Sequence, residues 1–235
     1  MVLYELFVSA PSGRHGLLAV VAYVVALLSA LVLHELAHGL VALWNGDGTA
    51  KAYGRLTLNP IKHFDWIGLI LMFLVGFGWA RPVPVNPNNF RNRKVGAITV
   101  SIAGVLTNII LAFFAAMGLA LFQRLTPQSE GAAYVIYFLQ ALSSLLLQIN
   151  VSFALFNVLP LYPLDGYRLL SCFVNENKPV MRFLRRYSLY IMLGFIVLNS
   201  ISVLSFLSPL HWYLARFGGL IRVGFTGFWR LIFNG

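Results

Sequence analysis

The longest apolar run of the chain, residues 16–44, constrains the fold more than any other feature of the sequence. It exceeds the roughly 20 residues that an α-helix needs to cross the hydrocarbon core of a bilayer. It is also far longer than the apolar part of a secretory signal peptide, which spans about 7–15 residues. We therefore expect a membrane-spanning helix that stays in the mature protein and ends at the Asn-Gly-Asp-Gly sequence of residues 45–48.

The composition extends this expectation to the whole chain. Of its 235 residues, 59% are hydrophobic and only 10% are charged, whereas soluble domains carry roughly 25% charged residues. Further apolar helices are expected at residues 95–122, 131–158 and 184–207. The predicted fold class is an all-α polytopic membrane protein with about four to six transmembrane helices, organised as a single domain over residues 1–235.

Two segments of the chain have a less regular pattern. Residues 48–90 are largely polar and β-tolerant, but residues 66–78 within them form a short apolar run with three glycines. This pattern favours a re-entrant or β-like membrane-associated segment, with residues 81–90 as an extended return. The tail, residues 209–235, places three arginines among aromatic residues, which predicts an interfacial amphipathic helix or a weak span.

The formal net charge of +10 lies mainly in short loops at the ends of the predicted helices. That distribution follows the positive-inside rule, so we do not expect nucleic acid as a partner. The most basic loops, 81–94 and 168–186, are predicted to be cytoplasmic, which brings residues 34–38 and residue 165 to a similar depth. The single cysteine, Cys172, excludes an internal disulfide and a cysteine-based metal cluster.

Three ionisable residues interrupt the first apolar run, where residues 34–38 read His-Glu-Leu-Ala-His. Ionisable side chains inside a membrane are costly and indicate a functional site. His34 and His38 lie on one helix face, so both imidazoles can reach one metal ion. Glu35 is adjacent and is expected to act as general base on a water at that ion. A catalytic zinc site of this kind needs a third protein ligand.

The third ligand is sought among the acidic residues. Of seven, only Glu35 and Asp165 lie in or at the end of a strongly apolar run. Asp165 belongs to the sequence NVLPLYPLDG, residues 157–166, whose prolines break a helix and allow a side chain to be directed inward. An aspartate of an ordinary turn before a glycine is the structural alternative. His63, in a polar loop, is the rival ligand.

These motifs resemble those of the site-2 protease family of intramembrane zinc metalloproteases. HELAHG at residues 34–39 resembles the H-E-x-x-H helix of that family, and residues 157–166 resemble its N-x-x-P-x-x-P-x-D-G motif. Tyr167 stands where many members have a second glycine. Weaker likeness to the compact branch without PDZ or CBS domains is found in residues 54–65, 78–90 and 103–112.

The resemblance implies one zinc ion per chain, held by His34, His38 and Asp165, with Glu35 as the general base. It implies a zinc-dependent intramembrane endopeptidase that hydrolyses peptide bonds in or near transmembrane segments, with its active site toward the cytoplasmic side. Asn157, two turns before Asp165, is a candidate for binding the substrate backbone or the developing oxyanion. A hydrogen bond from Asn157 to a neighbouring helix carbonyl is an equal alternative.

The expected partners are a transmembrane protein or peptide substrate and the lipid bilayer. The expected location is the cytoplasmic (inner) membrane if the protein is prokaryotic, as a multi-pass integral protein. Asn108, inside the helix predicted at 95–122, is interpreted as structural. A non-catalytic metal-binding membrane protein, whether pseudoprotease or transporter-like, remains the alternative. Haem ligation is disfavoured because the two histidines share one helix face, whereas haem ligation across the plane needs different helices.

Overall fold

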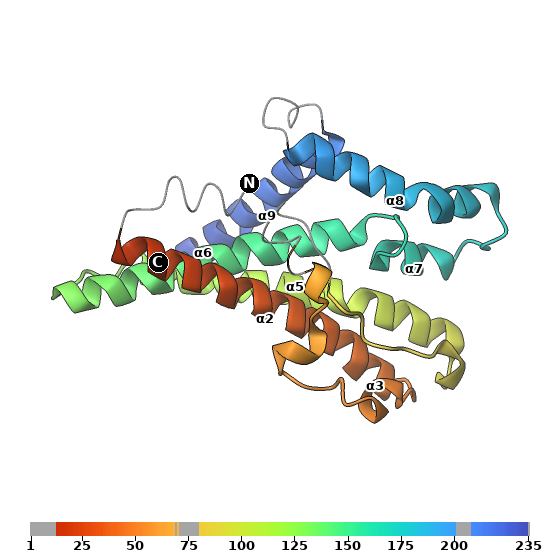
Figure 1. Ribbon diagram of the computed structural model, residues 1–235. Coiled ribbons are helices and arrows are strands. Elements are labelled where there is room, and N and C mark those ends of the chain that lie inside the picture. Colours follow the sequence, from red (N-terminus) through yellow and green to blue (C-terminus); the bar gives the residue numbers. More distant parts are fainter. Residues whose placement is uncertain (1–12, 69, 71–79, 201–207, 235) are drawn as a thin grey trace.

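The structure, a computed structural model, describes residues 13–68, 70, 80–200 and 208–234 (Figure 1). The described residues form no strand, and their β pairing is limited to an isolated bridge between Phe64 and Ala80. This confirms the all-α class. The long helices are α2 (Arg14–Trp44), α5 (Arg93–Phe122), α6 (Glu130–Val158), α8 (Pro179–Ser200) and α9 (Pro209–Asn234).

Helices α2, α5 and α6 are long and apolar enough to cross a membrane, with 31, 30 and 29 residues. At about 1.5 Å per residue, each exceeds the roughly 30 Å hydrocarbon thickness of a bilayer. Two of them begin at a side-chain cap: the Asn92 side chain accepts from the backbone N–H groups of Lys94 and Val95, and Ser129 accepts from Ala132. The protein is therefore an integral membrane protein with several spans.

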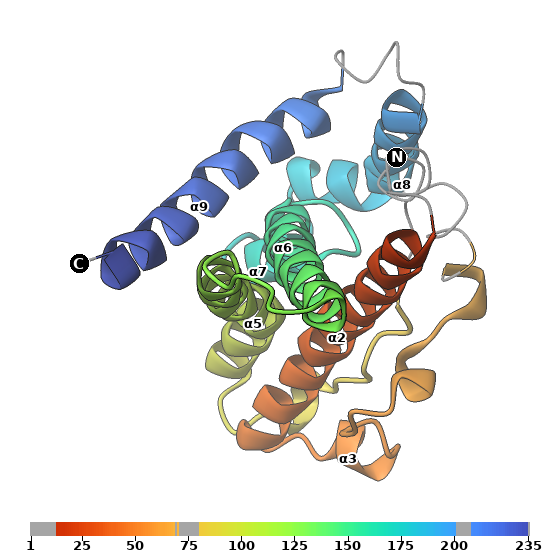
Figure 2. The same cartoon turned by 90° about the vertical axis from the view of Figure 1, so that its left-hand side faces the viewer.

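Small residues let these three helices approach closely, and they lie side by side in Figure 2. Ala26 and Ala30 of α2 pack with Ile149 of α6, while Ala112 and Ala116 of α5 pack on another part of α6. All four alanines have no exposed surface. Without a hydrophobic driving force in lipid, such small residues favour association by allowing close backbone contact. The result is a core of three mutually packed helices, α2, α5 and α6.

Helices α8 and α9 are long enough for a span, with 22 and 26 residues, but their described residues are not apolar enough for one. The helix expected at 184–207 begins earlier, at Pro179, and is described as far as Ser200. The tail forms α9, which packs on the α5–α6 core through Ile221, Phe225 and Trp229. The indole N–H of Trp229 also donates to the Phe113 carbonyl at 3.0 Å. The tail is thus a helix bound to the core.

The segment between α2 and α5 contains short helices rather than strands in its described part. They include α3 (Thr49–Ala52), η1 (Pro60–His63) and η2 (Pro87–Asn89). Residues 66–68 and 70 are also helical, and residues 81–86 are free of helix. Most of the apolar run at 66–78 lies outside the described residues, so its re-entrant path stays a prediction.

A buried acid fastens this segment to the end of α2. Asp47 has no exposed surface, and its Oδ1 accepts from the Thr49 N–H at 3.1 Å and from Asn89 Nδ2 at 2.8 Å. Its Oδ2 accepts from the Asn86 N–H at 2.7 Å. Because both oxygens bond to donors distant along the chain, the extended residues before η2 are held beside α2.

Candidate metal centre

Two histidines of α2 and the first residue of the short helix α7 (Asp165–Ser171) converge inside the core. His34 and His38 are 7% and 3% exposed, and their Nε2 atoms are 3.1 Å apart. Asp165 Oδ2 lies 3.3 Å from His34 Nε2 and 3.1 Å from His38 Nε2. The three potential ligand atoms all lie within 4.8 Å of one another. Residues separated by about 130 positions in the sequence thus form one buried cluster.

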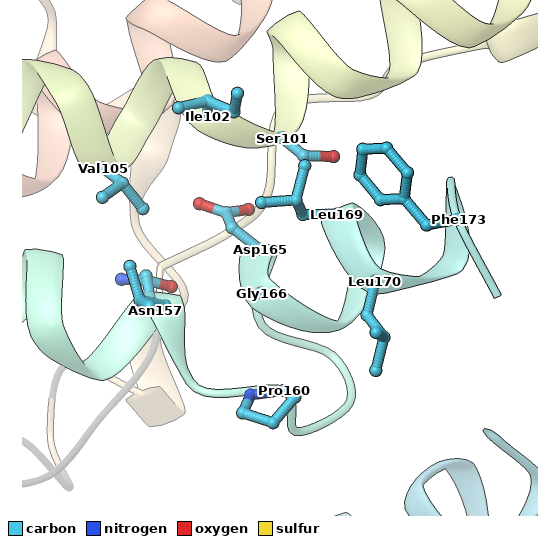
Figure 3. A pocket seen from close by; sticks show the side chains of 11 residues that line it. Ser101, Ile102, Val105, Asn157, Pro160, Asp165, Gly166, Leu169, Leu170 and Phe173 are labelled. Atoms are coloured by element: carbon cyan, nitrogen blue, oxygen red, sulfur yellow. The ribbon is translucent and has the colours of Figure 1, made fainter. Parts of the chain in front are cut away.

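The break between α6 and α7 aims Asp165 at this cluster. Helix α6 ends at Val158, and α7 (Asp165–Ser171) begins at the aspartate itself. A Cβ at Gly166 would lie 2.1 Å from the Val158 carbonyl oxygen, so only glycine allows the turn to close this tightly. In Figure 3 the Asp165 carboxylate points from the start of α7 toward α5. Tyr167 is buried against Tyr162 in an edge-to-face contact, so it packs within the turn.

Helix α5 passes directly against the two imidazoles. A Cβ at Gly104 would lie 2.4 Å from His34 Cε1 and 2.5 Å from His38 Nε2. No side chain fits there without displacing a ring, because the helix backbone cannot retreat while it packs on α2 and α6. Gly104 therefore leaves the space that the two rings occupy.

The polar atoms of the cluster fit a metal cation. His38 Nδ1 donates to the Val100 carbonyl at 2.7 Å, and His34 Nδ1 lies 2.6 Å from Asn108 Oδ1. With hydrogens on both Nδ1 atoms, both Nε2 atoms present lone pairs toward the carboxylate. Asp165 Oδ2 is buried without a hydrogen bond of good geometry. Three acceptors that face one another in a buried site repel unless a cation lies among them, and this N, N, O set suits zinc.

Burial acts to raise the pKa of Asp165, but hydrogen bonds from the facing imidazoles, when these carry Nε2 hydrogens, outweigh burial and lower the pKa. When the hydrogens lie on Nδ1, a cation among the three ligand atoms would stabilise the ionised carboxylate instead. A carboxylate must be deprotonated to bind a metal.

Glu35 lies next to His34 but contacts a different part of the molecule. Its Oε2 accepts from the Val83 N–H at 2.9 Å, in the segment before η2. The neighbouring Arg55 guanidinium donates to the Arg81 carbonyl at 2.6 Å, which helps to hold that segment. Burial lowers the pKa of Arg55 despite the opposing influence of Glu35. Glu35 thus lies on the same helix as the two histidines, and its carboxylate contacts the extended backbone before η2.

Asn157 and Asp165 line one cavity of about 380 Å³ between α5, the end of α6 and α7 (Figure 3). Besides these two residues and Ser101, the lining is apolar or glycine. Asn157 Nδ2 donates to the Phe153 carbonyl at 3.0 Å, so the hydrogen bond within its own helix is present. Its second amide hydrogen and its oxygen are available to a molecule in the cavity.

The sequence interpretation missed two residues. Asn108, interpreted as structural, has no exposed surface and contacts His34 directly. Asn150 was not singled out, yet it is fully buried and its Oδ1 accepts from Asn108 Nδ2 at 2.7 Å. The sequence feature that points to both is a polar side chain inside an otherwise apolar helix. His63, the rival ligand, is buried elsewhere with Nε2 on the Thr57 carbonyl at 2.8 Å, and it is not part of the cluster.

Two histidines one helical turn apart and a buried aspartate could hold a metal ion, as in metal-dependent enzymes, and the class of enzyme follows from similarity to known proteins. Residues 22–199 match the model of peptidase family M50. The match covers more than half of the chain, so the chain belongs to peptidase family M50. It is a zinc metalloprotease embedded in a membrane.

Two bacterial relatives agree with this assignment. The chain is 45% identical over 151 residues to "Putative zinc metalloprotease YwhC" of Bacillus subtilis (strain 168), an alignment that covers 63% of this chain and 67% of that protein. It is 27% identical over 155 residues to "Putative zinc metalloprotease Rip2" of Mycolicibacterium smegmatis (strain ATCC 700084 / mc(2)155), covering 64% of this chain and 56% of that protein. No solved structure matches the chain significantly.

Proposed function

We propose that this chain is a single-domain, zinc-dependent intramembrane endopeptidase that hydrolyses peptide bonds in or near transmembrane segments of membrane proteins. The observation that carries the proposal is the buried cluster of His34, His38 and Asp165, with ligand atoms within 4.8 Å of one another. The cluster lies among helices long enough to span a bilayer. A hydrolase with its site there meets substrates that are themselves in the membrane.

Each residue of the cluster has a distinct part in the proposal. His34, His38 and Asp165 would hold one zinc ion, which supplies Lewis acidity toward the scissile carbonyl and the attacking water. Glu35 takes the proton of that water and later gives it to the leaving amine. The Val83 N–H holds one carboxylate oxygen of Glu35, and the other oxygen receives the proton.

The cavity beside Asp165 is proposed to receive the substrate. Its mostly apolar lining suits the side chains of a transmembrane segment. Asn157 would hydrogen-bond the substrate backbone with its free amide hydrogen and oxygen. Because the carbonyls of a transmembrane helix are bonded internally, the substrate must unwind locally before it can use these groups.

The sidedness follows from the charge distribution. Loops 81–94 and 168–186 carry most of the basic residues that flank the core helices, which favours the cytoplasmic side for both. The segment before η2 contacts Glu35, beside His34, and α7 begins at Asp165 of the cluster, so the active site is proposed to open toward the cytoplasm. In a prokaryote the membrane would be the cytoplasmic (inner) membrane.

Replacement of the proposed base tests the function. Glu35→Gln is expected to retain zinc and to lose cleavage of a membrane-protein reporter by about 10²–10⁴-fold, because an amide cannot accept the proton. Glu176→Gln, the same change at an exposed ion pair with Arg185, serves as the matched control and should cleave normally. Equal cleavage by Glu35→Gln and the control would refute the proposal. Zinc binding by a wild-type protein that cleaves nothing would favour a non-catalytic metal-binding role.

A further inference from the structure

The Nδ1 atoms of the two histidines have different kinds of hydrogen-bond partner. His38 Nδ1 contacts the Val100 carbonyl at 2.7 Å. A carbonyl only accepts, so Nδ1 must carry the hydrogen and Nε2 must hold the lone pair. His34 Nδ1 contacts the side chain of Asn108 at 2.6 Å. An amide offers either an oxygen or an NH₂ group, so the orientation of Asn108 decides the tautomer of His34.

A chain of hydrogen bonds fixes that orientation. Asn150 Nδ2 donates to the Leu146 carbonyl at 2.8 Å, and Asn108 Nδ2 donates to Asn150 Oδ1 at 2.7 Å. Because the Leu146 carbonyl only accepts, Asn150 must turn its NH₂ group to Leu146 and its oxygen to Asn108. Asn108 must then turn its NH₂ group to Asn150 and its oxygen to His34. A flipped amide at either position would bring like groups face to face.

Because both asparagines are buried, their amide groups cannot flip without losing hydrogen bonds. Neither Asn108 nor Asn150 has exposed surface, so a flipped amide would find no compensating bulk water. Asn108 Nδ2 also lies 3.4 Å from the Ala30 carbonyl, a second acceptor on the same side. The Leu146 carbonyl, Asn150 and Asn108, which together we call the asparagine relay, therefore connect α6 through α5 to His34 on α2.

We propose that Asn150 and Asn108 are positioning residues that set the tautomer of His34 and so hold its Nε2 as a metal ligand. The inference rests on the zinc site of the proposed function. Asn150 acts through Asn108, because its side chain bonds to Asn108 and to the Leu146 carbonyl rather than to a histidine or the carboxylate. His38 needs no such relay, because its backbone partner cannot change direction.

Zinc affinity of the full chain in detergent tests the relay, measured by competition with a chromophoric chelator. Asn108→Leu and Asn150→Leu are each expected to weaken zinc binding about 10–100-fold, the effect of losing an outer partner of a metal-bound histidine. Ser143→Ala is the matched control: Ser143 is a buried polar residue of α6 that faces Gly118 of α5. It should leave the affinity unchanged.

A rescue variant separates the effect of the amide orientation from the effect of side-chain packing. In the Asn150→Leu background, Asn108→Asp is expected to restore most of the zinc affinity, because an ionised carboxylate only accepts and so keeps the hydrogen on His34 Nδ1. Nitrogen-15 chemical shifts of the metal-free protein provide a second readout. They should show a protonated His34 Nδ1 in wild type and a mixture of tautomers in Asn150→Leu.

The outcomes distinguish the relay from the site itself. Zinc binding by Asn150→Leu as tight as that of Ser143→Ala would overturn the relay, and so would failure of Asn108→Asp to rescue. If His34→Ala loses zinc while Asn150→Leu keeps it, the relay is wrong and the site stands. If His34→Ala keeps zinc, the proposed site fails, and the relay fails with it.

Discussion

Asp47 and Asp165 are both buried carboxylates, with 0% and 5% exposed surface, but their surroundings are opposite. Both oxygens of Asp47 accept hydrogen bonds from the protein, one from nearby Thr49 and two from the distant Asn86 and Asn89. Those bonds lower its pKa, although burial acts to raise it. Asp165 instead faces two imidazole nitrogens, and its Oδ2 has no hydrogen bond of good geometry.

This difference separates an acid that stabilises a fold from one that binds a ligand. A buried charge needs partners, and Asp47 has them within the protein. The Arg168 guanidinium lies 3.9 Å from Oδ1 of Asp165, but the two imidazole nitrogens that face Oδ2 are themselves acceptors, so Oδ2 has no donor within the described protein. The comparison predicts that removing Asp47 changes folding and leaves zinc binding intact, and that removing Asp165 does the reverse.

The largest expected effect is on zinc binding by Asp165→Ala. Loss of a direct ligand should weaken zinc binding by more than the roughly 100-fold that an outer partner can cost. The metal-free protein should unfold at nearly the same denaturant concentration as wild type, because no well-made hydrogen bond of Oδ2 is lost. Chelator competition and unfolding after zinc removal measure the two quantities. A large loss of metal-free stability would make Asp165 a structural acid like Asp47.

Asp47→Ala should have the opposite profile. It removes the acceptor of the half-buried Asn86 and Thr49 N–H groups and one of the two acceptors of the Asn89 amide, and a donor left unpaired costs about 1–3 kcal/mol before water reaches it. We expect the free energy of unfolding to fall by about 2–4 kcal/mol. Zinc affinity of the folded protein should stay unchanged. A parallel loss of zinc would show that this region supports the metal site directly.

A smaller effect on zinc affinity is expected at Gly104, where a substitution would displace the histidine rings rather than remove a ligand. Gly104→Ala places a Cβ 2.4 Å from the His34 ring, so the rings must shift, at a cost of about 1–3 kcal/mol that should appear mainly in zinc affinity. Gly131→Ala is the control, because a Cβ there meets nothing within 4 Å on α6. Zinc titration of both variants measures the difference, and equal affinities would contradict the packing of α5 on the site.

The parts of the fold that depend on local pattern were predictable from the sequence. The helices expected at 16–44, 95–122 and 131–158 differ from α2, α5 and α6 by two residues or fewer at each end. Apolar length and caps determine these limits. The segment between α2 and α5 was harder, because distant hydrogen bonds to Asp47 shape it. Residues 49–52 there are helical, where we expected extended chain.

The candidate site was predictable where the geometry of a helix, or a break in a helix, fixes the direction of a side chain. The spacing of His34 and His38 places them on one face, and the prolines before Asp165 allow its approach. Asn150 shows where such reasoning ends. Gln148, two residues earlier, is equally polar in the same apolar helix but is exposed, whereas Asn150 is fully buried. Only the packing of α6 on α5 distinguishes the two.

The zinc content of purified protein tests the central claim most directly. Wild type should bind one zinc ion per chain after chelator treatment and resupply of zinc, and the His34→Ala/His38→Ala double variant should bind none at the same protein concentration. Both proteins should remain folded in detergent. A wild type that takes up no zinc, or a double variant that still binds one ion, would contradict a metal centre at His34, His38 and Asp165.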